Sequence, residues 1–370
     1  MTDLKTFDHY LNDEGPAALV IRESLMPVEG PDGVVFPATF ASGDGFEGGY
    51  NIDTDASGRS VALIDTVGSQ ANRIEPIFMS ERFRHLVPQI VVTAGDRQVS
   101  ILEAGHRAGD ALVRCSSLQG ELQESFKAVL KGDAAPLASI APTSLVFGVW
   151  DSRDTQAKLP RIVASTIRAY NVRKLRRSAQ FTPATEYVNE QLLDQPADKK
   201  ISDAYAERGF IHVPAAGTHG GVIADGGIRR DATLGLAALR LLKAGKDEAR
   251  SIALRRYILG LSLVAFTQPS SSYLRQGCTL VRNPAKANED EFVEVHTDGR
   301  REPCKVTREI ALAYATKTAE AFGIGASRTV PFEKERALKD VSGEGDAKRA
   351  KKAAGKKAAT KKPASEESDA

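Results

Sequence analysis

The longest apolar stretch of the chain sets the first limit on how it can fold. This stretch, Tyr257–Phe266, has ten residues, well short of the ~20 that a membrane-spanning helix requires. We therefore interpret it as the core of a buried helix over residues 250–266. With 42% hydrophobic and 26% charged residues, the composition is that of a globular protein with a sizeable core. We expect no membrane association.

The N-terminus and the cysteines favour a cytoplasmic location. Residues 1–15 include several acids and lack the apolar core of a secretory signal. The cysteines, Cys115, Cys278 and Cys304, are far apart and do not have the CxxC spacing of a zinc or redox site. A reducing cytoplasm suits such a chain.

Charge is distributed unevenly along the chain, whose formal net charge is +2. Residues 341–370 hold eight Lys/Arg and five Asp/Glu, and from Ser342 onward there is no large apolar side chain. We expect a disordered tail there, either a polycation that binds phosphate or a solubilising extension. Residues 1–340 are expected to form a single elaborated domain. Its net charge of −1 means that a nucleic-acid site within it must be a local patch.

Apolar periodicity and turn residues predict mixed helices and strands in the first part of the chain. We expect strands at about 17–25, 34–41, 88–94 and 97–104, and helices at 65–78, 122–130 and 136–140. The order is that of an α+β protein.

The middle of the chain is predicted to form a strand, a helix and a strand over residues 143–181. The apolar run 143–150 favours a buried strand, and Pro160 suits the first turn of a helix. Arg161, Ser165 and Arg168 would then share the polar face of that helix, and residues 172–181 would form the second strand. Further on, a helix over 231–245 is expected, capped by Asp231 and closed by Gly245.

Three motifs that suggest a cofactor, a metal or catalysis are rejected. Residues 43–48 match GxGxxG, but no helix is expected after them, so a hairpin tip is the better interpretation. His212 and His219 lack a third ligand at an ordered spacing, so no metal is expected, and contact with a polyanion suits such loop histidines better. The sequence has no nucleophile elbow. We expect no cofactor and no catalytic residue.

Basic residues are densest between Arg153 and Arg177, which favours a track for a phosphate backbone. The candidate residues are Arg153, Lys158, Arg161, Arg168, Arg173, Lys174, Arg176 and Arg177. A second candidate is the glycine-rich segment 217–227, which precedes Arg229 and Arg230 at an expected helix start. Asp231 is an alternative partner for these two arginines.

Several of these segments together resemble one family, the RAMP-superfamily backbone proteins of type I-U (I-G) CRISPR systems, which are Cas-seven-like subunits of a Cascade complex. The resemblance rests on residues 35–41, 63–78, 144–172 and 226–242. It implies a modified RRM-like (ferredoxin-like) palm with helical insertions and a β-hairpin thumb, which we place within 180–228. It also implies additional polar contacts to RNA at the helix start formed by Ser69, Gln70, Asn72 and Arg73, for which ordinary helix capping is the alternative.

The resemblance further implies a guide-RNA-binding subunit without catalytic activity. Copies of the chain would assemble along the CRISPR guide RNA with other subunits of the interference complex, and the guide would pair with target DNA. The alternative is a metal-independent endoribonuclease that processes precursor CRISPR RNA, with His219 as its general base. A nucleotide-dependent oxidoreductase built on Gly43–Gly48 would instead carry bound NAD or flavin.

The Lys-rich tail yields the first testable prediction. If residues 341–370 add only non-specific attraction, deleting them should weaken RNA binding modestly, because fewer counterions are released. The slope of log affinity against log salt should fall, while assembly on RNA persists. Filter binding at several salt concentrations measures the slope, and light scattering measures the assembly. Loss of the assembly on truncation would contradict this view of the tail.

Overall fold

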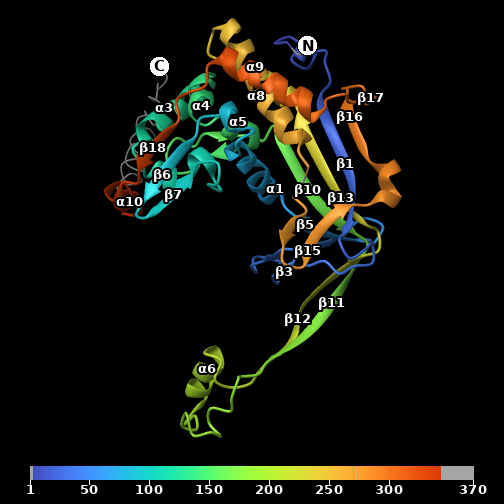
Figure 1. Ribbon diagram of the computed structural model, residues 1–370, viewed down its shortest axis with the longest axis vertical. Coiled ribbons are helices and arrows are strands. Elements are labelled where there is room, and N and C mark those ends of the chain that lie inside the picture. Colours follow the sequence, from blue (N-terminus) through green and yellow to red (C-terminus); the bar gives the residue numbers. More distant parts are fainter. Residues whose placement is uncertain (1–2, 270, 343–370) are drawn as a thin grey trace, which may run out of the picture.

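The computed structural model describes residues 3–269 and 271–342, so the expected tail lies outside the described residues except for its first two positions. The chain forms an α+β protein, as predicted, with a large sheet, a helix-rich part beside it and a long hairpin that projects away (Figure 1). Within the described residues, no helix is both long and apolar enough to cross a membrane.

The large sheet is antiparallel throughout and has nine strands. Its main path runs β14-β15-β1-β13-β10-β5-β4, and β16 pairs with both β1 and β17. The bounds are Tyr273–Arg275 (β14), Cys278–Arg282 (β15), Ala18–Pro27 (β1), Ile228–Gly235 (β13), Val163–Tyr170 (β10), Ser60–Asp65 (β5), Ile52–Thr54 (β4), Glu291–Val295 (β16) and Arg301–Pro303 (β17).

Alternation along the central strands gives this sheet two different faces. In β1, Leu19 and Ile21 are buried whereas Arg22 on the other side is partly exposed, because successive side chains of a strand point to opposite faces. The covered face packs against the helices α1 (Val67–Ile74), α5 (Thr143–Phe147) and α8 (Glu248–Thr267). The predicted buried helix is confirmed, since every residue from Tyr257 to Phe266 in α8 is buried.

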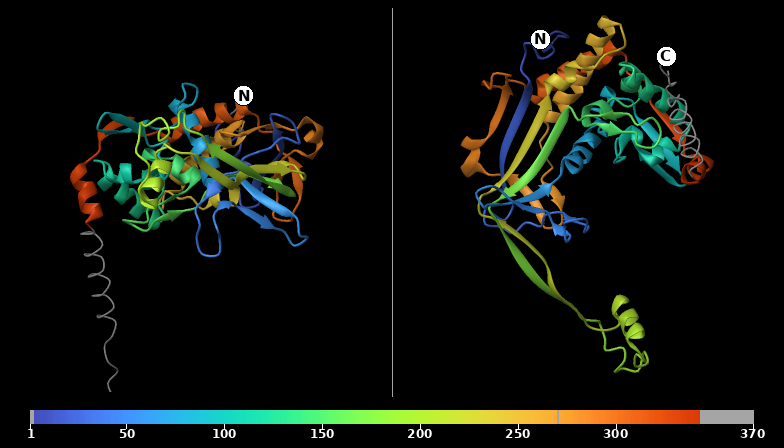
Figure 2. Two further views of the ribbon diagram at one scale, coloured as in Figure 1. Left: turned by 90° about the horizontal axis from the view of Figure 1, so that it is seen from below. Right: turned by 180° about the vertical axis from the view of Figure 1, so that it is seen from behind.

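The projecting hairpin continues two central strands directly. β11 (Val172–Phe181) follows β10 after one residue, and β12 (Val213–Ala224) leads into β13 through a turn at 225–227. The two strands form a two-stranded sheet of their own, which an isolated bridge between Val222 and Val35 joins to the body of the protein. α6 (Lys199–Glu207) lies at the far end (Figures 1 and 2). We call β11 and β12 the arm, and residues 182–212 the tip.

The helix-rich part contains the remaining longer elements. Its helices are α2 (Ala111–Arg114), α3 (Gln119–Leu130), α4 (Ala135–Ile140) and α10 (Lys334–Val341), beside a three-stranded sheet of β18 (Arg328–Pro331), β6 (Ile90–Ala94) and β7 (Arg97–Ser100). α9 (Arg308–Phe322) packs along α8. The helices predicted at 65–78, 122–130 and 136–140 and the strands predicted near 88–104 are confirmed.

The predicted strand, helix and strand over 143–181 is wrong in its first two elements. Residues 143–147 form the short helix α5, all five of them buried, and Gly148 at φ +78° ends it before β8 (Val149–Trp150). A short helix buried on every side has no polar face, so its apolar run cannot be distinguished from a buried strand.

The segment after Pro160 is the strand β10, not a helix. Its apolar residues happened to recur at helical spacing, but Val163, Thr166 and Ile167 are β-branched, and β10 pairs with β13 on one side and β5 on the other. Sheet pairing on both edges therefore decided the structure. Arg161, Ser165 and Arg168 consequently share no helix face.

Two further predictions are corrected. The helix expected over 231–245 is mostly the strand β13, and only Leu236–Arg240 is helical (α7), so Asp231 is not a helix cap and Gly245 does not close the helix. The strand expected at 34–41 is reduced to a bridge at Val35 and the two-residue β2 (Thr39–Phe40).

A buried carboxylate anchors β5 and α1 to the sheet. Asp65, the last residue of β5, is 1% exposed. It pairs with Arg275 Nη2 at 2.8 Å and Arg73 Nε at 3.1 Å, and accepts a hydrogen bond from Gln70 Nε2 at 2.7 Å. Gln70 Oε1 in turn accepts from Ser165 Oγ on β10 at 2.9 Å.

Removing this carboxylate should be costly. Asp65→Ala leaves two partly buried arginines without their counter-charge, and we expect a loss of about 3–5 kcal/mol in the free energy of unfolding. The exposed pair of Glu121 with Arg328 provides a control, because Glu121→Ala should cost less than about 1 kcal/mol. Urea denaturation measures both. Equal losses would mean that the Asp65 cluster does not anchor the fold.

Candidate nucleic-acid interface

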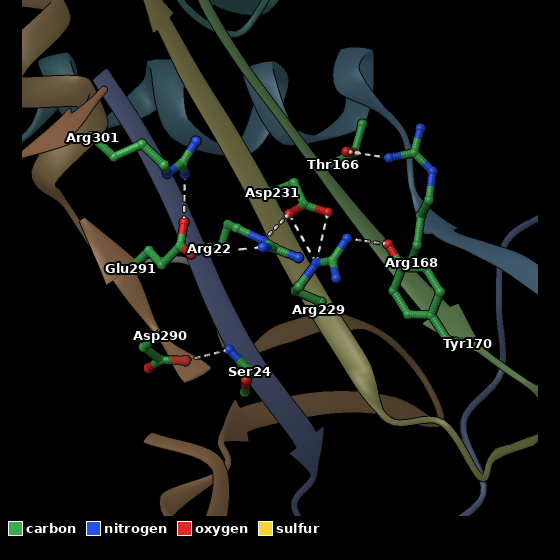
Figure 3. Close-up of polar contacts among 10 residues, drawn as sticks. All are labelled: Arg22, Ser24, Thr166, Arg168, Tyr170, Arg229, Asp231, Asp290, Glu291 and Arg301. Atoms are coloured by element: carbon green, nitrogen blue, oxygen red, sulfur yellow. Dashed lines mark hydrogen bonds and ion pairs between the residues drawn. The ribbon is translucent and has the colours of Figure 1, made fainter. Parts of the chain in front are cut away.

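The uncovered face of the sheet, which we call the open face, brings together side chains from three neighbouring strands. Arg229 on β13 lies opposite Ser24 of β1 and Arg168 of β10, and Asp231 lies opposite Arg22 and Thr166. Because these positions are two residues apart on each strand, their side chains share one face. Figure 3 shows them gathered there, with Glu291 and Arg301 from β16 and β17 beside them.

Arg229 is held rigidly on the open face. Its Nε donates to both carboxylate oxygens of Asp231 at 2.9 and 3.0 Å, and its Nη2 donates to Tyr170 Oη at 2.8 Å. The guanidinium also lies over the Tyr170 ring, 4.8 Å from its centroid. Tyr170 is therefore covered on this side and does not offer that ring face to a nucleobase.

The arginines of the open face differ in how far they are neutralised. Arg22 lies between Asp231 and Glu291, at 3.6 and 3.7 Å, and Arg301 pairs with Glu291 at 2.5 Å. Arg168 donates to Thr166 Oγ1 at 2.8 Å and forms no ion pair within residues 3–269 and 271–342. Of the open-face arginines, Arg168 is thus best placed to meet an incoming phosphate.

Arg230 points to the covered face and belongs to the core. It is 4% exposed, and its Nε lies 2.5 Å from Glu23 Oε2, while Arg282 Nη2 lies 2.5 Å from the other Glu23 oxygen. Burial alone would raise the pKa of Glu23, but attraction to Arg230 and hydrogen bonds from Arg282 outweigh it and hold the pKa below its ordinary value. The prediction that Arg230 contacts phosphate at a helix start is corrected accordingly, because the residue lies inside the sheet and is already paired.

The four polar residues expected at a helix start are spread along the whole of α1, with Asn72 and Arg73 in its last turn, and they also serve the interior. Gln70 and Arg73 belong to the Asp65 cluster, and the Ser69 backbone amide donates to the N-cap side chain of Thr66 at 3.0 Å. Asn72 Oδ1 accepts from Arg107 Nη2 at 3.2 Å. Helix capping, the alternative considered for these residues, therefore involves Ser69 alone, whereas Gln70, Asn72 and Arg73 have partners elsewhere in the interior.

Arg107 is in turn paired in the interior with Glu75, at 2.6 Å. Burial raises the pKa of Glu75 to about 7 despite this arginine. The segment 63–78, which carries much of the family resemblance, therefore maintains the architecture of the protein.

The dense basic segment between Arg153 and Arg177 is divided by β10. Arg153, Lys158 and Arg161 are exposed before the strand begins, and Lys158 lies over the exposed ring of Trp150 at 5.4 Å. Arg168 lies within the strand, whose eight residues span about 23 Å, and the other cations follow it. The segment thus forms two separate basic patches.

The second patch lies on the arm. Its four side chains are exposed: Arg173, Lys174, Arg176 and Arg177. Arg173 pairs with Asp225 at the root of the arm, at 2.6 Å, whereas Lys174 and Arg176 have no ion pair within the described part of the chain. The tip is different, because residues 182–212 hold six Asp/Glu and three Lys/Arg. A basic arm therefore ends in an acidic tip.

The two histidines lie apart on the hairpin. His219 is at the root of the arm, edge-on to Tyr50 at 4.7 Å between ring centroids, and its ring packs on Gly49. His212 belongs to the tip and its Nε2 lies 2.6 Å from Glu186 Oε1. Gly49 is in β3 (Gly49–Tyr50), which pairs with β2. The GxGxxG segment is the connection between these two strands, with no helix after it, which confirms the hairpin-tip interpretation.

Arg22 and Tyr170 are among the open-face residues that sequence reasoning missed. Arg22 had a usable signal, since it alternates with Leu19 and Ile21 within an expected strand. Tyr170 lies in the segment that was predicted to be helical, so its position beside Arg229 required knowledge that residues 163–170 are extended.

The comparison with known families agrees with the resemblance noted from the sequence. Residues 19–174, from β1 to the start of β11, match the family described as CRISPR-associated protein GSU0053 (Cas_GSU0053). This match identifies a CRISPR-associated family. No curated protein matches the chain.

Arg229 and Arg230 lie on opposite faces of the sheet, so the same substitution at each compares an exposed ion pair with a buried one. Arg230→Gln should lower the free energy of unfolding by about 3–5 kcal/mol at pH 7, because Glu23 stays buried with less counter-charge. Arg229→Gln should cost about 1 kcal/mol or less, because its pair is partly exposed. Urea denaturation measures both losses.

The penalty of Arg230→Gln should also depend on pH. A carboxyl with a depressed pKa stabilises the fold above its ordinary pKa, and this contribution is lost as the pH falls. The penalty should therefore shrink when the pH drops below 4.5, the ordinary value for Glu23. A penalty that is the same at pH 7 and pH 4 would contradict the role given to Glu23.

Proposed function

Because residues 19–174 match a CRISPR-associated family, we propose that this chain is a backbone subunit that binds the guide RNA of a type I-U/I-G interference complex and takes no part in catalysis. Copies of the chain would follow one another along the guide. Other subunits would join them, and target DNA would pair with the exposed guide bases. The three cysteines are free, which is typical of proteins in the reducing cytoplasm, where we propose that the complex acts.

The strand order supports an RRM-like palm. Four strands run in the order β15, β1, β13, β10, with helices between β1 and β10 and with α8 between β13 and β15. This is the antiparallel arrangement of a βαββαβ unit. The arm interrupts the unit between β10 and β13, where an ordinary hairpin turn would stand, and it is our candidate for the thumb.

The observation that carries the proposal is the continuity between the open face and the arm. β10 presents Arg168 near its end, and the next strand presents exposed cations from Arg173 to Arg177. Such a line of arginines and lysines neutralises successive phosphates without regard to base sequence. A guide requires this kind of grip, because its bases must remain free for pairing.

The aromatic residues of the sheet are consistent with a backbone grip. A standard RRM stacks bases on exposed aromatics of its sheet. Here the open-face tyrosine of β10, Tyr170, lies against Arg229. We infer that the protein holds sugar and phosphate, and leaves the bases unread.

The charge of the hairpin indicates where the RNA would lie. Phosphates are attracted to the exposed cations of the arm, but the acidic tip repels them. RNA contact is therefore proposed for the arm and its root, including His219, and not for residues 182–212.

Charge reversal tests this placement. The double variant Lys174→Glu with Arg176→Glu should weaken binding of a guide-length RNA for every base sequence. The slope of log affinity against log salt should flatten by about 0.7 for each phosphate that the variant no longer neutralises, the value for single strands. Filter binding across several salt concentrations measures both the affinity and the slope. Arg168→Glu should act in the same direction.

The matched control reverses two charges of the same sign on the tip. Lys199→Glu with Lys200→Glu changes the net charge equally and should leave RNA binding and its salt slope almost unchanged. If the tip variant weakens binding as much as the arm variant, only the net charge of the protein matters and the proposed track is wrong.

Assembly and the endoribonuclease alternative are tested with the same RNA. Light scattering should show a particle mass that grows with RNA length, because head-to-tail contacts do not close on themselves. A fixed dimer at every RNA length would contradict the backbone role. Cleavage of repeat RNA that is abolished by His219→Ala would favour the enzyme.

A further inference from the structure

A cluster of three side chains at the edge of the large sheet contains the chemical groups of a metal site. It lies on the hairpin of β16 and β17, beyond the residues that match the CRISPR-associated family. Glu294 and Glu302 are direct partners across the hairpin, and His296 lies two residues beyond Glu294. The potential ligand atoms of Glu294, His296 and Glu302 all lie within 4.8 Å of one another.

One ring nitrogen of His296, Nε2, lacks a hydrogen bond among the described residues. This nitrogen is buried, and only 15% of the side chain is exposed. The nearest carboxylate oxygen, Glu302 Oε2, is 3.9 Å away, which is too long for a hydrogen bond. A buried polar atom normally has a partner, and its absence requires an explanation such as an ion.

The negative charges of Glu294 and Glu302 are also incompletely neutralised by their neighbours. Like charges directly opposite each other on paired strands are destabilising. Arg300 pairs with Glu302 Oε1, and Tyr10 Oη donates to Glu294 Oε1 at 2.6 Å. These contacts orient both carboxylates, yet they leave Glu302 Oε2 turned toward His296 at the distance given above. A cation between them would satisfy the imidazole nitrogen and both carboxylates.

We propose that Glu294, His296 and Glu302 bind one divalent transition-metal ion, with Zn²⁺ as the best fit. Imidazole nitrogen and carboxylate oxygen bind zinc at about 2.0–2.2 Å, so ligands of one ion lie roughly 3–4 Å apart. The cluster reaches this arrangement with a small contraction. Three protein ligands leave a fourth position for water. Tyr10 is a positioning residue, because it acts through its hydrogen bond to Glu294.

Such an ion would cross-link the hairpin that carries all three of its ligands, and Tyr10 would connect this site to the segment before β1. β16 pairs with β1 along five residues, and Tyr10 comes from the short helix Asp8–Tyr10 ahead of β1. Bound zinc would thus link the segment before β1 to a hairpin almost 300 residues later, since Tyr10 and Glu294 are 284 positions apart. This role is independent of RNA binding, so the two proposals can fail separately.

Titration of the metal alone tests the site. Full-length protein without an affinity tag is stripped with chelator, dialysed and titrated with ZnCl₂ by calorimetry. We expect one Zn²⁺ per chain and a higher melting temperature of the loaded protein. His296→Ala, Glu294→Gln and Glu302→Gln should each weaken the affinity about tenfold or more, and Tyr10→Phe by about tenfold.

The control removes a histidine and carboxylate pair elsewhere. His212→Ala disrupts the contact with Glu186 in the tip and should leave zinc affinity and stoichiometry unchanged. Melting of each metal-free variant shows whether it is folded, and Glu302→Gln, on the most exposed ligand, is the variant least able to disturb the fold. The proposal is overturned if the wild-type protein takes up no zinc, or if His296→Ala and Glu302→Gln bind it as tightly as the wild type.

Discussion

The antiparallel pairing of β13 between β1 and β10 is the constraint on which the rest of the structure depends. The strand β13 is paired on both edges, along eight residues with β1 and along seven with β10. A shift of its register by one residue would expose Leu234 and Ala232 and bury Asp231. The same register sends Arg229 and Arg230 to opposite faces. One arginine becomes part of an open, hydrated surface, and its neighbour becomes a buried partner of Glu23.

The arm is a consequence of this pairing. Two strands that leave the sheet as neighbours stay paired beyond its edge, so the cations of β11 follow Arg168, the one cation of β10, along the chain. The departure requires a change of direction, which is made at Asn171 and Gly227, both at positive φ (+48° and +83°). Asparagine and glycine are the residues that adopt this conformation most readily. The geometry of the candidate interface is therefore set by backbone pairing before any side chain contributes.

The elements that were predicted correctly are those whose own residues carry a clear pattern. Helix α8 was found because a long apolar segment with a polar start has few alternatives, and β11 was found from its own composition. Residues 143–170 were misassigned because α5 is buried on all sides and β10 carries an accidental helical spacing. The buried partner of Arg230 could not be predicted, since Arg230 and Glu23 are separated by 207 positions and only the folded sheet brings them together.

The open face and the arm differ in how their cations could act on a phosphate backbone: the open face fixes their positions, and the arm keeps their charge. On the open face, Asp231 and Glu291 hold Arg22, Arg229 and Arg301 in fixed positions and partly neutralise them. Arg168 has no acidic partner among the described residues. On the arm, Lys174 and Arg176 keep their full charge but are carried on a two-stranded ribbon. Residues 1–340 carry little net charge, so their overall electrostatic attraction for nucleic acids is weak. A strand of RNA that contacts the arm and the open face together gains from both, whereas RNA on either surface alone does not. Under the proposed function, this division would favour one defined path for the RNA over general adhesion to a basic protein.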